Sequence, residues 1–154
     1  LPDPFAGERV FQTLTQVAGR AGRSERGGKV ILQTFDPENQ VIRSAAEHDV
    51  NGFYAYELKQ RKRLGYPPFT RLVRLEYRST DQALSEKEAM RVAEKISVGS
   101  VKQSGMIGPV PSYFARVGGY YRWQIVLRGA NPQEWLRDVK LDGWRVEVDP
   151  VSLL

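Results

Sequence analysis

Apolar side chains recur at intervals of three and four residues near the beginning of the chain. This spacing places Val10, Leu14 and Val17 on one face of a predicted amphipathic helix over residues 10–21. A turn follows, and residues 29–35 then make a run rich in β-branched residues, which predicts a short strand. Because the apolar residues of this run are consecutive instead of alternating, we expect the strand to be buried on both faces.

Two further helices are expected before residue 65. Asp36 followed by Pro37 matches an N-cap and the first position of a helix, and a longer helix is expected from about Val50 to Leu64, ending at Gly65. A strand buried on both faces needs neighbouring strands, which residues 1–65 do not supply. We therefore expect these residues to be the last part of an α/β domain with its connecting helices, a piece of a longer protein whose first residue here is not methionine.

A second module is expected from residue 66, because consecutive prolines at 67 and 68 exclude a helix there. Alternating apolar and charged residues at 73–77 predict a half-buried strand, and a helix follows from Asp81. The remaining expected elements are strand-like residues at 106–110 and 113–117 that prolines interrupt, a strand at 120–128, a helix beginning at Asn131, and a strand at 144–148. The order β-α-β-β-α-β predicts a ferredoxin-like domain at 66–154, and hence an α+β fold with both helices on one face of an antiparallel sheet.

Composition narrows the class of protein. The 154 residues are 41% hydrophobic and 27% charged, which supports a packed core and a solvated surface. No apolar run approaches the roughly 20 residues of a membrane-spanning helix, so we expect no membrane contact. The absence of cysteine fits a cytoplasmic location, and the single histidine, His48, has no companion with which to hold a metal. The net charge of +5 is compatible with an anionic partner.

Residues 16–23, QVAGRAGR, carry the strongest chemical signal. At about 100° per residue, Gln16, Arg20 and Arg23 fall in one sector of the helix, away from its apolar face. Glycines at 19 and 22 leave the neighbouring backbone uncovered. Guanidinium groups stay charged and present a planar fork of donors, so a pair of them at a helix end suits phosphate oxygens. A solvated polar face has the same spacing, and spacing alone leaves both interpretations open.

This octapeptide resembles the sixth motif of the superfamily 2 helicases, Q-x-x-G-R-x-x-R. With segments further along the chain, it resembles the primosomal protein N′ (PriA) family of replication-restart helicases. Those segments are Gly65-Tyr66-Pro67-Pro68-Phe69-Thr70, Gly108-Pro109-Val110-Pro111, Tyr121-Arg122-Trp123-Gln124-Ile125 and Asp149-Pro150. The resemblance covers nearly the whole chain in the family's order, although Pro4-Phe5-Ala6-Gly7 matches the family's pattern only in part.

The resemblance implies an ATP-dependent 3′-to-5′ DNA helicase of the bacterial cytoplasm that restarts stalled replication forks and loads the primosome. Residues 1–65 would then end the second RecA-like lobe, with Arg20 and Arg23 as catalytic residues that reach the nucleotide phosphates and Gln16 and Gly19 beside them. The implied cofactors of the full-length protein are ATP and Mg²⁺, with zinc bound outside this segment. The implied partners are forked and single-stranded DNA, single-strand binding protein and primosome proteins. Because no nucleotide-binding loop occurs in these residues, we expect the segment alone to bind none of these cofactors and to be inactive.

Two other groups of basic residues are candidate DNA contacts. One group ends the third predicted helix, where cations also complement the helix dipole: Lys59, Arg61, Lys62 and Arg63. The other is expected on the polar face of the sheet: Arg74, Arg122, Gln124 and Arg128. A sheet face that displays arginines instead of aromatic rings favours sequence-independent phosphate binding over base stacking. A solvated polar face is the equal alternative.

A different class of protein fits part of the pattern. An independent nucleic-acid-binding or protein-interaction module with a ribosomal-protein-like fold has the same order of elements after residue 66. That alternative predicts that residues 1–65 complete their own hydrophobic core, whereas the helicase interpretation predicts an exposed strand edge. A free-standing phosphate-binding enzyme is disfavoured, since no cluster of acid, base or nucleophile accompanies the arginines.

Overall fold

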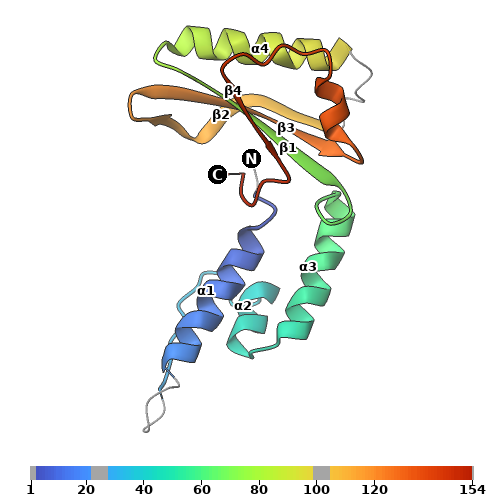
Figure 1. Cartoon of the computed structure of the whole chain (residues 1–154). Helices are drawn as coiled ribbons and strands as arrows, with labels where there is room; N and C mark the ends of the chain where they lie inside the picture. The colour runs from blue at the N-terminus through green and yellow to red at the C-terminus, as the bar shows by residue number, and fades with distance from the viewer. Residues whose placement is uncertain (1–2, 22–27, 99–104, 154) are drawn as a thin grey trace. The chain divides into compact units, whose positions relative to one another are not determined.

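Helices and a four-stranded antiparallel sheet make up the regular structure of the computed structural model, which describes residues 3–21, 28–98 and 105–153 (Figure 1). The chain divides between Leu64 and Gly65 into two units. We call Pro2–Leu64 the helical unit and Gly65–Leu154 the sheet unit. Together they form an α+β protein.

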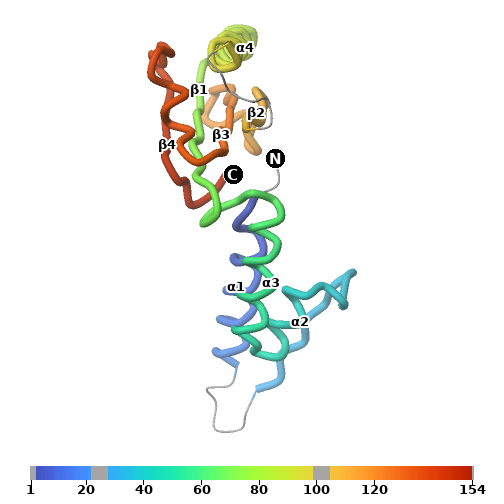
Figure 2. The backbone as a smooth tube through the Cα atoms, turned by 90° about the vertical axis from the view of Figure 1, so that its right-hand side faces the viewer, coloured from blue at the N-terminus to red at the C-terminus, as the bar shows by residue number. Residues whose placement is uncertain are grey.

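Three helices form the described part of the helical unit: α1 (Ala6–Ala21), α2 (Gln40–Ala46) and α3 (Val50–Leu64). The predictions for α1 and α3 are confirmed, although α1 begins four residues earlier than expected. α3 ends at Gly65, whose φ of 64° is readily adopted only by a residue without a side chain. In the view of Figure 2, α1 and α3 overlap and α2 lies to one side of them. The contact between α1 and α3 contains the stacked rings of Phe11 and Phe53, with centroids 4.0 Å apart.

Two expectations for the helical unit are wrong. α2 begins at Gln40 because Asn39, and not Asp36, is its N-cap and accepts a hydrogen bond from the backbone N–H of Val41.

Residues 28–34 form neither helix nor strand. Ile31 is 84% exposed and Phe35 is fully exposed, so the strand expected to be buried on both faces is absent from the described residues. A strand needs neighbours to satisfy its backbone, and the described part of this unit contains no other strand.

The sheet unit has the expected succession of elements, with one difference. Its elements are β1 (Arg71–Ser79), α4 (Gln82–Val98), β2 (Met106–Val117), β3 (Tyr120–Gly129), the short helix η2 (Pro132–Leu136) and β4 (Trp144–Val148). The strands lie in the order β2-β3-β1-β4. The difference is η2, which is a 3₁₀ helix of five residues whose N-cap, Asn131, makes no capping hydrogen bond with its side chain.

The central strand β1 is buried on both faces of the sheet. On one face Val73 and Leu75 pack with Ile125 and Leu127 of β3 against the apolar side of α4, which lies along the sheet in Figure 1. On the other face Leu72 belongs to a smaller cluster with Tyr66, Val126 and Leu153. The alternation predicted for β1 is therefore correct, but its polar positions are also covered.

The core of the helical unit yields a test of stability. The buried apolar residues of this core are Phe11, Ala45 and Phe53. The substitution Phe53→Ala removes one ring of the stacked pair and leaves a cavity, so we expect the unit's free energy of unfolding to fall by about 3–5 kcal/mol. Lys62→Ala, at an exposed position of the same helix, should change it by less than about 0.5 kcal/mol. Urea unfolding followed by helical circular dichroism measures both, and equal losses would contradict this core.

Candidate functional site

The last turns of α1 carry the described residues of the QVAGRAGR motif, Gln16 to Ala21. Arg20 and Gln16 are both exposed, and Arg20 lies about 180° around the helix from the buried Phe11. A Cβ atom placed on Gly19 would meet no other atom within 4 Å, so the backbone there is uncovered. Arg23, the other arginine of the motif, lies outside the described residues.

Arg20 has the chemistry that a phosphate-binding residue needs. Within the described ranges no carboxylate forms an ion pair with Arg20. Its guanidinium, together with the amide of Gln16, therefore leaves hydrogen-bond donors facing solvent from one helical surface. This arrangement can bind a phosphate group, although two exposed side chains alone do not enclose one.

A recess of about 350 Å³ lies elsewhere in the helical unit, beside the end of α1. The residues around it are mostly small or apolar: Ala18, Gly28, Val30, Leu32, Ala45, Ala46 and His48. His48 lies at the junction of α2 and α3 with a φ of 55°, as expected for a residue at a helix junction. The described residues contain no group of three or more His, Cys, Asp or Glu side chains placed to hold a metal ion.

The basic end of α3 separates into one structural cation and three exposed ones. The guanidinium of Arg61 donates to Glu57 at 2.9 Å and to Glu8 of α1 at 2.8 Å, and it lies 5.3 Å from the ring centroid of Phe5. Burial lowers the pKa of Arg61, but the two carboxylates outweigh burial and raise it. Arg61 therefore joins α1 to α3. The exposed cations of this helix end are Lys59, Lys62 and Arg63.

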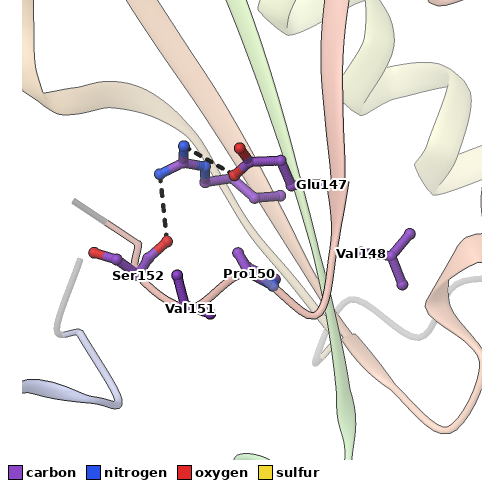
Figure 3. A pocket seen from close by; sticks show the side chains of 6 residues that line it. Glu147, Val148, Pro150, Val151 and Ser152 are labelled. Carbon is purple, nitrogen blue, oxygen red and sulfur yellow. Dashed lines mark hydrogen bonds and ion pairs between the residues drawn. The ribbon is translucent and has the colours of Figure 1, made fainter.

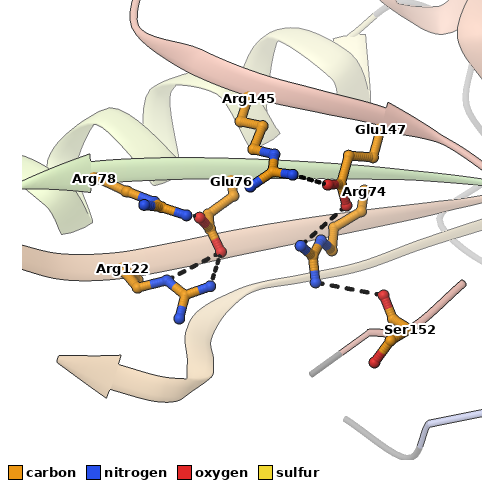
Figure 4. Close-up of polar contacts among 7 residues, drawn as sticks. All are labelled: Arg74, Glu76, Arg78, Arg122, Arg145, Glu147 and Ser152. Carbon is orange, nitrogen blue, oxygen red and sulfur yellow. Dashed lines mark hydrogen bonds and ion pairs between the residues drawn. The ribbon is translucent and has the colours of Figure 1, made fainter. Parts of the chain in front are cut away.

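The polar face of the sheet carries the predicted arginines, and carboxylates lie between them (Figure 4). The side chain of Glu76 is 1% exposed and accepts hydrogen bonds from Arg122, with Nε at 3.1 Å, and from Arg78 at 2.6 Å. Arg74 pairs with Glu147 at 3.0 Å. The arginines lie on the face predicted from the sequence, whereas their carboxylate partners come from other strands and were not predicted.

Glu76 is held ionised by its neighbours. Burial alone raises the pKa of this carboxyl group, because a charge is disfavoured away from water, but the hydrogen bonds from Arg122 and Arg78 lower it by more. The pKa of Glu76 therefore lies below its ordinary value. Arg128, the third predicted arginine of this face, has its guanidinium 5.5 Å from the ring centroid of Tyr66.

A shallow recess of about 350 Å³ borders this face where β4 leads into the C-terminal residues (Figure 3). Its lining includes Pro150, Val151 and Ser152, with Arg74 and Glu147 at its edge. Arg74 also donates to the backbone carbonyl of Ser152 at 3.4 Å. The recess therefore contains an ion pair that is already formed and offers little to an additional anion.

An exposed aromatic pair lies on the hairpin of β2 and β3. Tyr113 is 67% exposed and Phe114 is 57% exposed, and their rings meet edge to face with centroids 4.9 Å apart. The sequence alone predicted no role for these two residues. The available signal was a stretch from Gly105 to Gln133 that contains aromatic residues and arginines but no aspartate or glutamate.

The ion pairs of Glu76 predict how stability depends on pH. Because the folded state lowers the pKa of Glu76, its contribution is present above the ordinary value of 4.5 and is lost as the pH falls through the lower folded value. Glu76→Gln should cost about 3 kcal/mol at neutral pH, since Arg122 loses its buried partner. It should also make the loss of stability in acid shallower.

Urea unfolding at neutral and acidic pH measures both effects. Glu134→Gln, at an exposed carboxylate, is the control and should leave both the stability and its dependence on pH close to those of the unmodified chain. If the free energy of unfolding falls with decreasing pH as steeply in Glu76→Gln as in the unmodified chain, the proposed contribution of Glu76 is wrong.

Known proteins match this chain over most of its length. The sequence model of the family described as primosomal protein N C-terminal domain matches residues 62–151. The replication restart protein PriA of Synechocystis sp. is 37% identical, over 98% of this chain and 19% of the relative. That of Thermotoga maritima is also 37% identical, over 99% and 21%, and that of Bacillus subtilis is 34% identical, over 83% and 16%.

These alignments cover most of this chain but only about a fifth of each relative. None of the helices in the described residues has the length and apolarity to cross a membrane. The matched residues 62–151 include the last three residues of α3 and nearly all of the sheet unit. From these matches, the chain belongs to the PriA family of replication restart proteins.

Proposed function

We propose that the full-length protein is an ATP-dependent 3′-to-5′ DNA helicase that restarts stalled replication forks and loads the primosome, and that this chain is its C-terminal part. Membership of the PriA family supports this proposal, as do the names of relatives that are replication restart proteins. The observation that carries it is Arg20, an exposed cation at the end of α1 within the sequence Q-x-x-G-R-x-x-R.

The residues of this helix face fit the phosphates of a nucleotide. Arg20 donates from a group that stays charged at every physiological pH, and Gln16 adds a neutral donor one turn earlier. When ATP is bound, its hydrolysis supplies the free energy for unwinding. The part of Arg20 is to donate hydrogen bonds to the oxygens of the transferred phosphoryl group, where negative charge accumulates. In this proposal Arg23 has the same role, and Mg²⁺ and zinc are bound by residues outside this chain.

The helical unit is proposed to be the end of a RecA-like lobe. Its buried apolar core, in the described residues, is limited to Phe11, Ala45 and Phe53, while Ile31 and Phe35 are exposed. Large apolar residues exposed in this way are typical of a surface that packs against further polypeptide. An independent module would be expected to bury them, so the exposure favours the helicase over the alternative of a ribosomal-protein-like module.

DNA contacts are proposed for the exposed cations at the end of α3: Lys59, Lys62 and Arg63. Arg61 is better assigned to the contact between α1 and α3, because its guanidinium is already paired. Forked and single-stranded DNA, single-strand binding protein and primosome proteins are the proposed partners, in the bacterial cytoplasm. By this proposal the isolated chain binds DNA and does not hydrolyse ATP.

The role of Arg20 is tested in the full-length protein. Arg20→Ala should lower DNA-stimulated ATP hydrolysis by about 1,000-fold, the lower end of the range for arginine fingers. Binding of DNA should be unchanged, since the substitution is expected to act on the transferred phosphoryl group. Gln12→Ala, at an exposed position about two turns earlier on α1, is the matched control and should retain full activity. Normal hydrolysis by Arg20→Ala would overturn the assignment.

The cations of α3 are tested through the dependence of DNA binding on salt. Replacement of Lys59, Lys62 and Arg63 by glutamine should reduce the slope of log affinity against log salt by about 2 for single-stranded DNA, because three phosphate contacts are lost. The matched control replaces three exposed lysines of the sheet unit, Lys87, Lys95 and Lys140, and removes the same net charge. Equal slopes for the two triple variants would show that only total charge matters and would contradict the site.

A further inference from the structure

The hairpin of β2 and β3 contains an irregularity that brings two aromatic rings together. Pro111 pairs with Trp123 and Arg116 pairs with Tyr121, so four residues of β2 lie opposite a single residue of β3. In a regular strand, neighbouring side chains point to opposite faces of the sheet. The bulge breaks this alternation, and Tyr113 and Phe114 instead meet ring to ring while both remain exposed.

The part of the hairpin that follows this pair in the chain carries exposed apolar residues and an arginine. Val117 and Tyr120, which flank the turn at Gly118 and Gly119, are each about half exposed. The guanidinium of Arg116 lies 5.2 Å from the ring centroid of Tyr121. The whole hairpin, Met106 to Gly129, contains three arginines and no carboxylate. Figure 1 shows this hairpin at the left end of the sheet.

We propose that Tyr113, Phe114 and Arg116 form a stacking platform for the bases of single-stranded DNA. This inference rests on the proposed function, by which the protein acts on DNA, and it adds a specific site and strand type. An edge-to-face pair leaves ring faces accessible, and each ring face accepts any base. Arg116 supplies a positive charge for the neighbouring phosphates, and no carboxylate of the hairpin opposes it.

Charge and ring exposure together favour a single strand over other partners. Duplex DNA keeps its bases stacked on one another, so an aromatic platform has no base face to contact there. The absence of acidic residues favours a polyanion over a basic protein surface. The arginines of the sheet face do not compete for this strand, since Arg122 is paired with Glu76 and Arg74 with Glu147.

The test measures binding of fluorescein-labelled oligothymidylate of about 15 nucleotides to the intact chain by fluorescence anisotropy. The double variant Tyr113→Ala/Phe114→Ala should raise Kd about ten-fold or more. The slope of affinity against salt should stay the same, because no charge is removed. The double variant Tyr113→Phe/Phe114→Tyr keeps both rings and should bind within about two-fold of the unmodified chain. Met90→Ala, at a similarly exposed apolar position on α4, is the control for loss of apolar surface and should bind normally.

A second measurement needs no substitution and so stays decisive if the alanine variant fails to fold. A strand of abasic sites of the same length retains the phosphates but has no bases. The unmodified chain should bind it about as weakly as the alanine variant binds oligothymidylate. Equal affinity for the two strands, unchanged binding by the alanine variant, or no binding of oligothymidylate by the unmodified chain would each overturn the platform.

These outcomes are separate from the test of the proposed function. ATP hydrolysis by the full-length protein depends on Arg20 and not on the hairpin. Normal hydrolysis combined with any of the overturning results would reject the platform alone. Intact stacking combined with absent hydrolysis would reject the helicase assignment and leave a DNA-binding platform.

Discussion

The burial of β1 on both faces of the sheet is the constraint on which the rest of the sheet unit depends. A central strand with Val73 and Leu75 on one side gains from burial there. On the other side it carries Arg74 and Glu76, and an unpaired charge at such a position is strongly destabilising. Cross-strand pairing to β3 and β4 supplies the partners Arg122 and Glu147. The ion pairs thus require the same register as the hydrophobic core, and a one-residue slip would lose both.

This constraint determines which cationic side chains are available to bind phosphate groups. Arginines that neutralise Glu76 and Glu147 are held close to the sheet, and their phosphate-binding capacity is reduced accordingly. The same holds for Arg61, whose two carboxylate partners join helices of the helical unit. Among the described residues, the exposed cations outside these ion pairs include Lys59, Lys62 and Arg63 at the end of α3 and Arg20 at the end of α1. These exposed cations are therefore available to contact an anionic partner.

The sequence predicted elements whose signals are local, and it missed features that depend on distant partners. The helix α1 and the alternation of β1 follow from spacing within one segment, and both are present. Glu76 lies 46 residues from Arg122, and Glu8 lies 53 residues from Arg61, so neither of these two pairs can be identified without the fold. The exposure of Tyr113 and Phe114 needed a register shift that no local pattern reveals. The strand expected at 29–35 failed for a related reason, since strand formation depends on neighbours and not on propensity alone.

The two proposed kinds of DNA contact differ in how they respond to salt, and the modest charge of the chain makes this difference important. A net charge of +5 provides few phosphate contacts, and binding that rests on counterion release weakens steeply as salt rises. Stacking on an aromatic ring releases no counterions, so its share of the binding free energy persists at cellular ionic strength. Because most of the described arginines already form ion pairs within the fold, the proposed binding of DNA gains from a contribution that is independent of salt. Tyr113 and Phe114, exposed by the bulge of β2, are placed to supply it.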